Sequence, residues 1–328
     1  MSAAASLLSP GGARIMRHLA PRRLLRTLLP SLSLALVLIA IGWLNPRAIS
    51  YFGFNLMLNL AILIALATIA QMFVITVNDL DLSIGYFVSF IGCAGATWLP
   101  ERPVLGVALI LGGISVYALV GALIRLRNLP SIVVTLGMSF VWQGAAIILL
   151  PQPGGAAPNW LRSLMSYHTP YVPFPIVAAI VIGLVTHFGL MRTSFGAVLR
   201  GAGGNPQAIE SAGWSILAIK MVAFALAGVF GVLSGLSLIG IATAADPNVG
   251  SGYTLLSIAG VILGGGEFVG GRVSPIGAVI GALTLALASN SLLSFMHVSP
   301  DWQIGANGLI LIVILAARAL INRGEAAQ

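Results

Sequence analysis

Residues 53–77 read GFNLMLNLAILIALATIAQMFVITV, a stretch without a single charged side chain, and Asn78, Asp79 and Asp81 follow it closely. A helix needs about 20 apolar residues to cross a hydrocarbon core about 30 Å thick, so this stretch suffices for one crossing. The whole chain of 328 residues is 58% hydrophobic and only 7% charged, whereas a soluble domain carries about 25% charged residues. The sequence therefore predicts an all-α, polytopic integral membrane protein.

Charged residues and clusters of Pro, Gly and Asn divide the chain into about ten transmembrane helices. They are expected at 28–44, 53–77, 84–99, 104–124, 131–150, 172–191, 220–241, 255–267, 276–295 and 304–321. The segments 84–99 and 255–267 are short for a full crossing, which indicates broken or partly re-entrant helices. Basic residues before 28–44 are typical of a secretion signal, but no small-residue cleavage site follows, so we expect a retained first helix.

The distribution of Lys and Arg predicts the orientation of these helices. With the N-terminus in the cytoplasm, 13 of the 16 basic residues lie inside and three, Arg47, Arg102 and Arg162, lie outside. This asymmetry predicts that both termini are cytoplasmic. The expected organisation is a basic tail at 1–26, one transmembrane domain at 27–322 and a short tail at 323–328. The net charge of +8 comes from scattered residues without a basic patch interleaved with aromatics, so nucleic acid is not an expected partner.

The cytoplasmic loop 192–219 is too polar to span the membrane and contains a short capped helix. Asn205 suits an N-cap, Pro206 the first helical position and Gly213 the end of the helix. Such a helix can dock into a groove of a partner, and an ordinary connector with one helical turn is the alternative. The order of residues resembles the coupling loop of ABC transporter permeases of the ribose, xylose and galactose type. That resemblance assigns coupling to an ATPase to Thr193, Gly196, Arg200, Gly204, Asn205, Pro206, Ala208, Glu210 and Gly213.

Two carboxylates, Asp79 and Asp81, interrupt hydrophobic sequence just before Ser83. A buried charge is costly inside a membrane, so they must face water, a helix end or a cation. With Ser83, they are candidates for gating groups in a substrate path, and the carboxylates are candidates for the cation site of a secondary transporter. A helix-capping turn is the alternative. The stretch resembles the Gly-Gly-Ile-Asp-Leu-Ser-Val-Gly signature of the sugar permeases, with Asn78-Asp79 in place of the two glycines.

The glycine-rich run 263–277 is the third feature. No Gly-Lys-Ser/Thr ending occurs in the chain, so the sequence provides no P-loop for ATP. Glycines at this density instead let helix backbones approach each other. The helix-packing candidates are Gly231, Gly235, Gly264, Gly265, Gly270, Gly271, Gly277 and Gly281.

Three further side chains are candidates for a translocation path. Gln143 and Trp142 combine an amide with an aromatic face, as sugar contacts do, although Trp142 can equally pack against lipid or protein. Asn290 places an amide at membrane depth, where it can bond another helix or a sugar hydroxyl. The four histidines lack metal-ligand spacing, and the single Cys93 excludes a disulfide framework. We therefore expect no catalytic residue and no metal site.

The four motifs follow the order of the sugar-permease family over about 55–320, nearly the whole chain. The resemblance implies the permease subunit of an ATP-driven importer of a monosaccharide or polyol in the bacterial cytoplasmic (inner) membrane. It implies three partners: ABC ATPase subunits that carry ATP and Mg, a periplasmic sugar-binding protein, and a second permease copy, identical or paralogous. This chain would be surrounded by lipid, bind no cofactor itself and not be an enzyme. The alternatives are a branched-chain amino acid permease or an ion-coupled transporter using Asp79 or Asp81.

Overall fold

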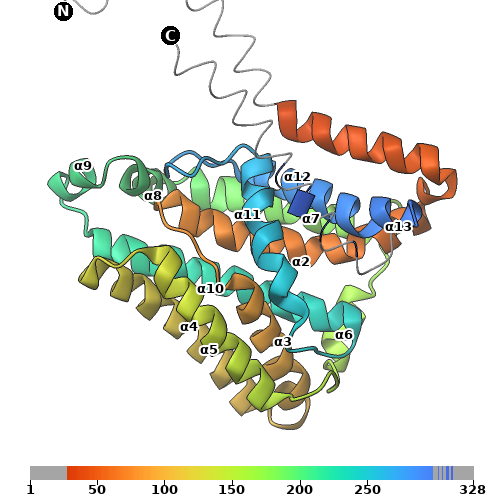
Figure 1. Ribbon diagram of the computed structural model, residues 1–328, viewed down its shortest axis with the longest axis horizontal. Helices are drawn as coiled ribbons and strands as arrows, with labels where there is room; N and C mark the ends of the chain where they lie inside the picture. The colour runs from red at the N-terminus through yellow and green to blue at the C-terminus, as the bar shows by residue number, and fades with distance from the viewer. Residues whose placement is uncertain (1–27, 298–301, 303–304, 306–307, 310–311, 313–328) are drawn as a thin grey trace, which may run out of the picture.

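The computed structural model describes residues 28–297, 302, 305, 308, 309 and 312. Over these residues it is a bundle of helices without a β-strand (Figure 1). The helices are Leu28–Leu44, α2 (Tyr51–Thr76), α3 (Ile84–Glu101), α4 (Pro103–Arg127), α5 (Ser131–Leu149), α6 (Asn159–Met165), α7 (Phe174–Leu184), α8 (Ser194–Gly204), α9 (Pro206–Ser211), α10 (Ile216–Ala242), α11 (Tyr253–Leu263), α12 (Pro275–Ala286) and α13 (Leu293–Phe295). Two π-helical turns, Val185–Met191 and Leu287–Leu292, extend α7 and α12.

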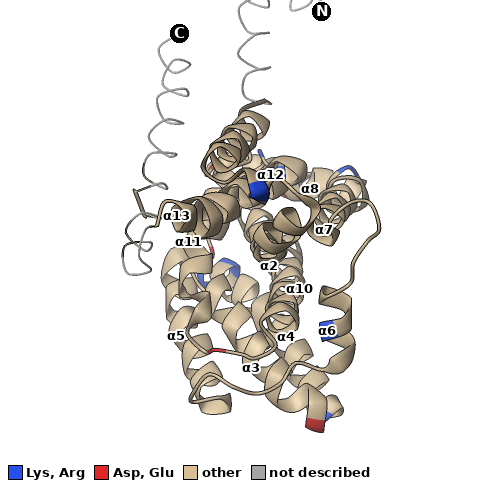
Figure 2. Ribbon diagram, turned by 90° about the vertical axis from the view of Figure 1, so that its right-hand side faces the viewer, with Lys and Arg blue, Asp and Glu red and all other residues tan. Residues whose placement is uncertain are grey.

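Six helices of the described part are long and apolar enough to cross a membrane. They are Tyr51–Thr76, Pro103–Arg127, Ser131–Leu149, Phe174–Met191, Ile216–Ala242 and Pro275–Phe295, and two shorter apolar helices lie at Leu28–Leu44 and Val249–Leu263. The prediction of an all-α, polytopic membrane protein is therefore confirmed. Figure 2 shows that Lys, Arg, Asp and Glu are sparse over the helical body. The expected segment 304–321 and the two tails lie outside the described residues.

The polar loop 192–219 contains one helix more than the sequence suggested. The expected short helix is α9, and α8 precedes it at Ser194–Gly204. The Thr193 hydroxyl accepts a hydrogen bond from Gly196 N at 3.4 Å, which caps α8, and Leu199 is fully buried under it. The many glycines of this segment lower its helix propensity, so tertiary packing rather than local preference explains why it is helical.

Two long helices are each followed by a connecting segment that turns back into the bundle. Re-entrant loop 1 (residues 77–83) connects α2 to α3, and re-entrant loop 2 (residues 243–252), which ends in the 3-10 turn Val249–Gly252, connects α10 to α11. Each loop has a left-handed residue among its first two positions, since φ is 61° at Asn78 and 65° at Thr243. α2 and α10 pack against each other, while α11 crosses α2 steeply (Figure 1).

The two re-entrant loops meet inside the bundle. Gly85 N donates to the Thr254 hydroxyl at 3.1 Å, and Gly250 N donates to the Ser89 hydroxyl at 2.8 Å. Non-helical backbone at membrane depth is tolerated only where protein satisfies its polar groups, and these reciprocal bonds do so. The helices α3 and α11 therefore begin within the body rather than at its end.

The ends of the bundle carry different short helices. α8 and α9 lie at one end, next to the last turn of α2 and the first turn of α10, and α6 lies at the opposite end (Figure 1). Within the bundle, Gly231 and Gly235 of α10 pack directly on side chains of α3, including Phe87 and Ile91. These contacts fix α10 between α2, α3 and α4.

Candidate functional site

α9 projects from the bundle and has no buried residue. The Asn205 side chain accepts a hydrogen bond from Ala208 N at 3.1 Å, and Pro206 is the first helical residue. Gly213, with φ of 86°, lies just after the helix where the chain reverses toward α10. The local sequence thus builds a short, pre-formed helix whose outer surface is free of contacts within the described chain.

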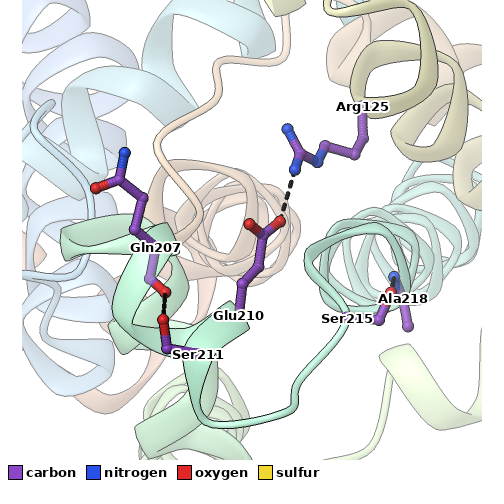
Figure 3. Close-up of polar contacts among 6 residues, drawn as sticks. All are labelled: Arg125, Gln207, Glu210, Ser211, Ser215 and Ala218. Atoms are coloured by element: carbon purple, nitrogen blue, oxygen red, sulfur yellow. Dashed lines mark hydrogen bonds and ion pairs between the residues drawn. The ribbon is translucent and has the colours of Figure 1, made fainter.

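A charge pair orients α9 relative to the bundle. Glu210 Oε1 lies 2.6 Å from Arg125 Nη2 in the last turn of α4 (Figure 3). Both side chains are exposed, 46% and 39%, so the pair contributes at most about 1 kcal/mol to stability. Its effect is to set the position of α9 against α4 rather than to hold the fold together.

Backbone contacts at glycines connect α8 to the end of α2. Gly203 packs on the carbonyl oxygen of Thr76, and Gly271 N donates to that same oxygen at 2.9 Å. A Cβ on Gly270 would lie 2.8 Å from Cβ of Asn78. We call this contact of three segments the glycine junction (Thr76–Asn78, Gly203, Gly270 and Gly271). Because there is no room for a Cβ at any of the three glycines, a displacement of α8 must also displace the end of α2.

Arg200, the remaining side chain of the coupling-loop candidates, turns inward. Its guanidinium donates to the carbonyl oxygen of Met191, at the end of the π-helical turn after α7. Arg200 therefore ties α8 to α7, whereas Gly204 has open space around its Cβ position.

Asp79 forms an ion pair with the only lysine of the chain. Lys220 Nζ lies 2.6 Å from Asp79 Oδ2, and the side chains are 18% and 8% exposed. Lys220 lies in the second turn of α10, so the pair joins re-entrant loop 1 to α10. The negative charge of Asp79 is thus compensated by protein.

Asp81 is fully buried, and its carboxylate is saturated with hydrogen bonds. It accepts from Ser83 N at 2.7 Å, from the Ser83 hydroxyl at 2.6 Å and from the Tyr117 hydroxyl at 2.8 Å. The first turn of α3 starts at Ile84, so the carboxylate also lies at the positive end of that helix. This geometry is that of a capping turn, the alternative that the sequence left open. The bond from Tyr117 also joins the turn to α4.

Side chains of two other helices satisfy the backbone of re-entrant loop 1. Leu80 N donates to the Ser131 hydroxyl and Leu82 N to the Thr135 hydroxyl, both at 3.0 Å. The Gln71 amide of α2 bonds both backbone groups of Asp81, at 3.0 and 3.2 Å, when its nitrogen faces the carbonyl oxygen. These bonds hold re-entrant loop 1 in one position against α5.

The structure does not bring Trp142, Gln143 and Asn290 together. Trp142 is buried and packs on the rings of Phe87, Phe90 and Tyr117. Gln143 is half-buried and donates to the Asn248 side chain at 3.3 Å. Asn290 is exposed in the π-helical turn after α12, where its carbonyl oxygen accepts from the Ser294 hydroxyl.

The glycine-rich run divides into two kinds of position. Gly264 and Gly277 face each other without space for a Cβ, and Gly281 packs on the backbone of Gly260. Gly265, with φ of 99°, lies in a turn with open space, and Gly270 and Gly271 belong to the glycine junction. α11 and α12 can thus approach closely, while the turn between them reaches α8.

Sequence reasoning missed the partners of its own candidates. Arg125 and Lys220 were counted only among the basic residues on the cytoplasmic side. Tyr117, Gln71 and Asn248 were not identified as candidates. The only lysine of the chain and the two carboxylates of segment 77–83 fall at the same predicted end of the membrane helices, which was a usable signal for the Asp79 pair. No pattern along the chain marks the other pairings, because the partners lie far apart in sequence. No group of three His, Cys, Asp or Glu able to hold a metal occurs among the described residues.

The chain is similar in sequence to several known proteins. The model of a family described as branched-chain amino acid transport system / permease component matches residues 27–315. The ribose import permease protein of Haemophilus influenzae is 26% identical over 87% of this chain and 91% of its own length. That of Bacillus subtilis is 26% identical over 91% and 93%, and the L-arabinose ABC transporter permease protein of Azospirillum brasilense is 29% identical over 83% and 80%. No solved structure matches the chain.

Proposed function

Since the chain belongs to the family of branched-chain amino acid transport system permease components, we propose that it is the membrane subunit of an ATP-driven ABC importer for a monosaccharide or polyol. It is a multi-pass protein of the inner membrane, and a transport subunit rather than an enzyme. The sugar assignment is supported by the relatives, which are named for ribose and L-arabinose and align over most of their length.

The observation that carries the proposal is the geometry of α9 and the glycine junction. A capped helix without buried residues offers a docking surface for an ATPase subunit. Gly203 transmits its displacement to the end of α2, and Glu210 transmits it to α4 through Arg125. Closure of two ATPase subunits would thereby change the separation of two α9 helices and shift the bundle between inward-open and outward-open states.

The proposal includes an orientation and an assembly. About ten helices cross the membrane with both termini in the cytoplasm, which places the α8–α9 end inside and the α6 end outside. ATPase subunits that carry ATP and Mg dock at α9, a periplasmic sugar-binding protein delivers cargo at the α6 end, and a second permease copy, identical or paralogous, completes the pathway. The large exposed apolar side chains of α5, such as Phe140 and Ile148, need lipid or that second copy to cover them.

Two alternatives predict different behaviour. A branched-chain amino acid permease has the same coupling apparatus and would transport leucine, isoleucine or valine. An ion-coupled carrier would need a carboxylate free to bind a proton or Na⁺. The Lys220 pair at Asp79 and the hydrogen bonds at Asp81 oppose that reading, because both carboxylates are already compensated.

The experiment that tests the proposal is purification of the tagged chain from its native membrane in mild detergent, followed by mass spectrometry and by uptake measurements. We expect an ABC ATPase and a periplasmic binding protein to copurify, and uptake of a monosaccharide to stop on ATP depletion. Reproducible absence of an ATPase, together with uptake that collapses with the ion gradient, would overturn the proposal. ATP-dependent uptake of leucine alone would favour the amino acid permease.

A further inference from the structure

Two side-chain amides form a pair on an exposed face of a membrane-crossing part of the bundle. Gln143 Nε2 in α5 donates to Asn248 Oδ1 at 3.3 Å. α5 is one of the six helices able to span a membrane, and Gln143 is its only amide or charged side chain. At about 1.5 Å per residue, Gln143 lies about 9 Å from the end of α5 at Leu149. It is therefore inside the span and not at its edge.

Asn248 lies at a similar depth although it belongs to a loop. Gly250, two residues later, bonds Ser89 of α3 and packs on Gly85, where re-entrant loops 1 and 2 meet. The Asp246 carboxylate accepts from Asn248 N at 2.8 Å, which fixes the turn and leaves the Asn248 side chain exposed. Polar side chains within a span face a water-filled cavity or a protein partner, because lipid cannot satisfy them.

The hydrogen bonding of the pair is incomplete. Gln143 Oε1 and Asn248 Nδ2 have no partner among the residues that the structure describes. Ser115 of α4 provides the contrast: it is also exposed, but its hydroxyl donates to Leu111 O of its own helix at 2.9 Å. Ser115 can therefore face lipid, whereas the amide pair requires a polar neighbour.

We propose that Gln143 and Asn248 form a hydroxyl-binding subsite on the wall of the translocation path. Each amide offers a donor and an acceptor without net charge, which matches the hydroxyl groups of a neutral polyol. The buried ring of Trp142, on the neighbouring residue, gives the subsite a rigid support against Phe87 and Phe90. The assignment of a sugar as the ligand rests on the proposed function, whereas the position on a water-filled path does not.

Thiol labelling tests the position of the subsite. Cys93 is the only cysteine and is fully buried, so Cys93→Ala provides the background. Into it we would introduce Gln143→Cys, Asn248→Cys and, as a matched control, Ser115→Cys. A water-soluble, membrane-impermeant methanethiosulfonate should modify positions 143 and 248 about tenfold faster than position 115 in the assembled importer. Equal slow modification at all three positions would place the pair against lipid or a second copy and overturn the proposal.

Substrate discrimination tests the hydroxyl contact. Uptake of radiolabelled ribose and 2-deoxyribose would be measured for the native chain, Gln143→Met, Asn248→Leu and the control Ser115→Ala. Loss of one hydrogen bond should raise KM for ribose about tenfold and reduce the preference for ribose over 2-deoxyribose, at unchanged amounts of assembled importer. If cysteines at positions 143 and 248 are labelled rapidly but Gln143→Met and Asn248→Leu leave KM and the preference for ribose unchanged, the hydroxyl contact is overturned. Absence of any monosaccharide or polyol uptake by the native chain would instead overturn the proposed function, and the sugar assignment with it.

Discussion

Gly85 and Gly250 face each other so closely that a Cβ on either residue would overlap the carbonyl oxygen of the other. Gly85 follows re-entrant loop 1 and Gly250 belongs to re-entrant loop 2, so the contact joins segments 165 residues apart (250 − 85). The hydroxyls of Thr254 and Ser89 bond the two glycine N–H groups. This point holds the starts of α3 and α11 together inside the membrane.

Alanine at this contact should disrupt the fold. Gly85→Ala and Gly250→Ala each force two backbones apart, and we expect a loss of about 1–3 kcal/mol or more. Thermal unfolding of the purified chain in detergent measures the effect. Gly137→Ala and Gly144→Ala on α5 are the controls, since no atom lies within 4 Å of either Cβ position. Equal melting temperatures for all four variants would contradict the close contact.

The neighbouring glycines Gly203 and Gly204 should respond differently to substitution by alanine, because only Gly203 belongs to the glycine junction. Gly203→Ala would push a methyl group into Thr76 O, whereas Gly204→Ala meets nothing within 4 Å. We therefore expect Gly203→Ala to lower the melting temperature and to reduce ATP-dependent uptake severalfold, and Gly204→Ala to behave as the native chain. Transport assays in vesicles with matched protein amounts provide the measurement. A stronger defect in Gly204→Ala would refute the assigned contact.

Thr135→Val tests how re-entrant loop 1 is held. The substitution conserves shape but leaves Leu82 N, a partly buried donor, without its acceptor, which costs about 1–3 kcal/mol. Thr97→Val removes only a bond to Cys93 O within one helix and is the control. Guanidinium or thermal unfolding of both variants should show the larger loss for Thr135→Val. Comparable losses would mean that the loop does not depend on α5.

The Asp79–Lys220 pair should behave as a coupled unit. Removing one partner leaves a largely buried charge, so Asp79→Leu and Lys220→Met should each destabilise by about 3–5 kcal/mol. The double variant should recover most of the loss, because no unpaired charge remains. A double-mutant cycle on unfolding free energies checks this. Additive losses would show that the two side chains do not interact, and uptake that survives in the double variant would exclude Asp79 as an obligatory ion site.

The Glu210–Arg125 pair should affect coupling more than stability. Because both side chains are exposed, Glu210→Gln and Arg125→Gln should change unfolding free energy by less than about 1 kcal/mol. Under the proposed function, both should reduce ATP-dependent uptake, and the exchange Glu210→Arg with Arg125→Glu should restore part of it. A single variant with full uptake would show that α9 needs no contact with α4.

Much of the fold follows from the sequence because membrane solvation acts on every residue. The expected segments 84–99, 131–150 and 220–241 agree with α3, α5 and α10 to within a few residues. The cap at Asn205 was also predictable, since an N-cap depends on side chains within one turn. α8 was missed because its helix depends on burial of Leu199 against other helices.

The sequence by itself determined the membrane class, most helix bounds and the short helix after Asn205, since hydropathy and capping are local properties of the chain. Only the tertiary structure decided what Asp79, Asp81 and Gln143 contact. Their partners Lys220, Tyr117 and Asn248 lie between 36 and 141 residues away along the chain. The packing of the helices and of the loops held between them brings these side chains within hydrogen-bonding distance. Asp79 and Asp81, which the sequence suggested as transport groups, are consequently paired with other side chains of the protein. The Gln143–Asn248 amide pair becomes the candidate contact in the translocation path.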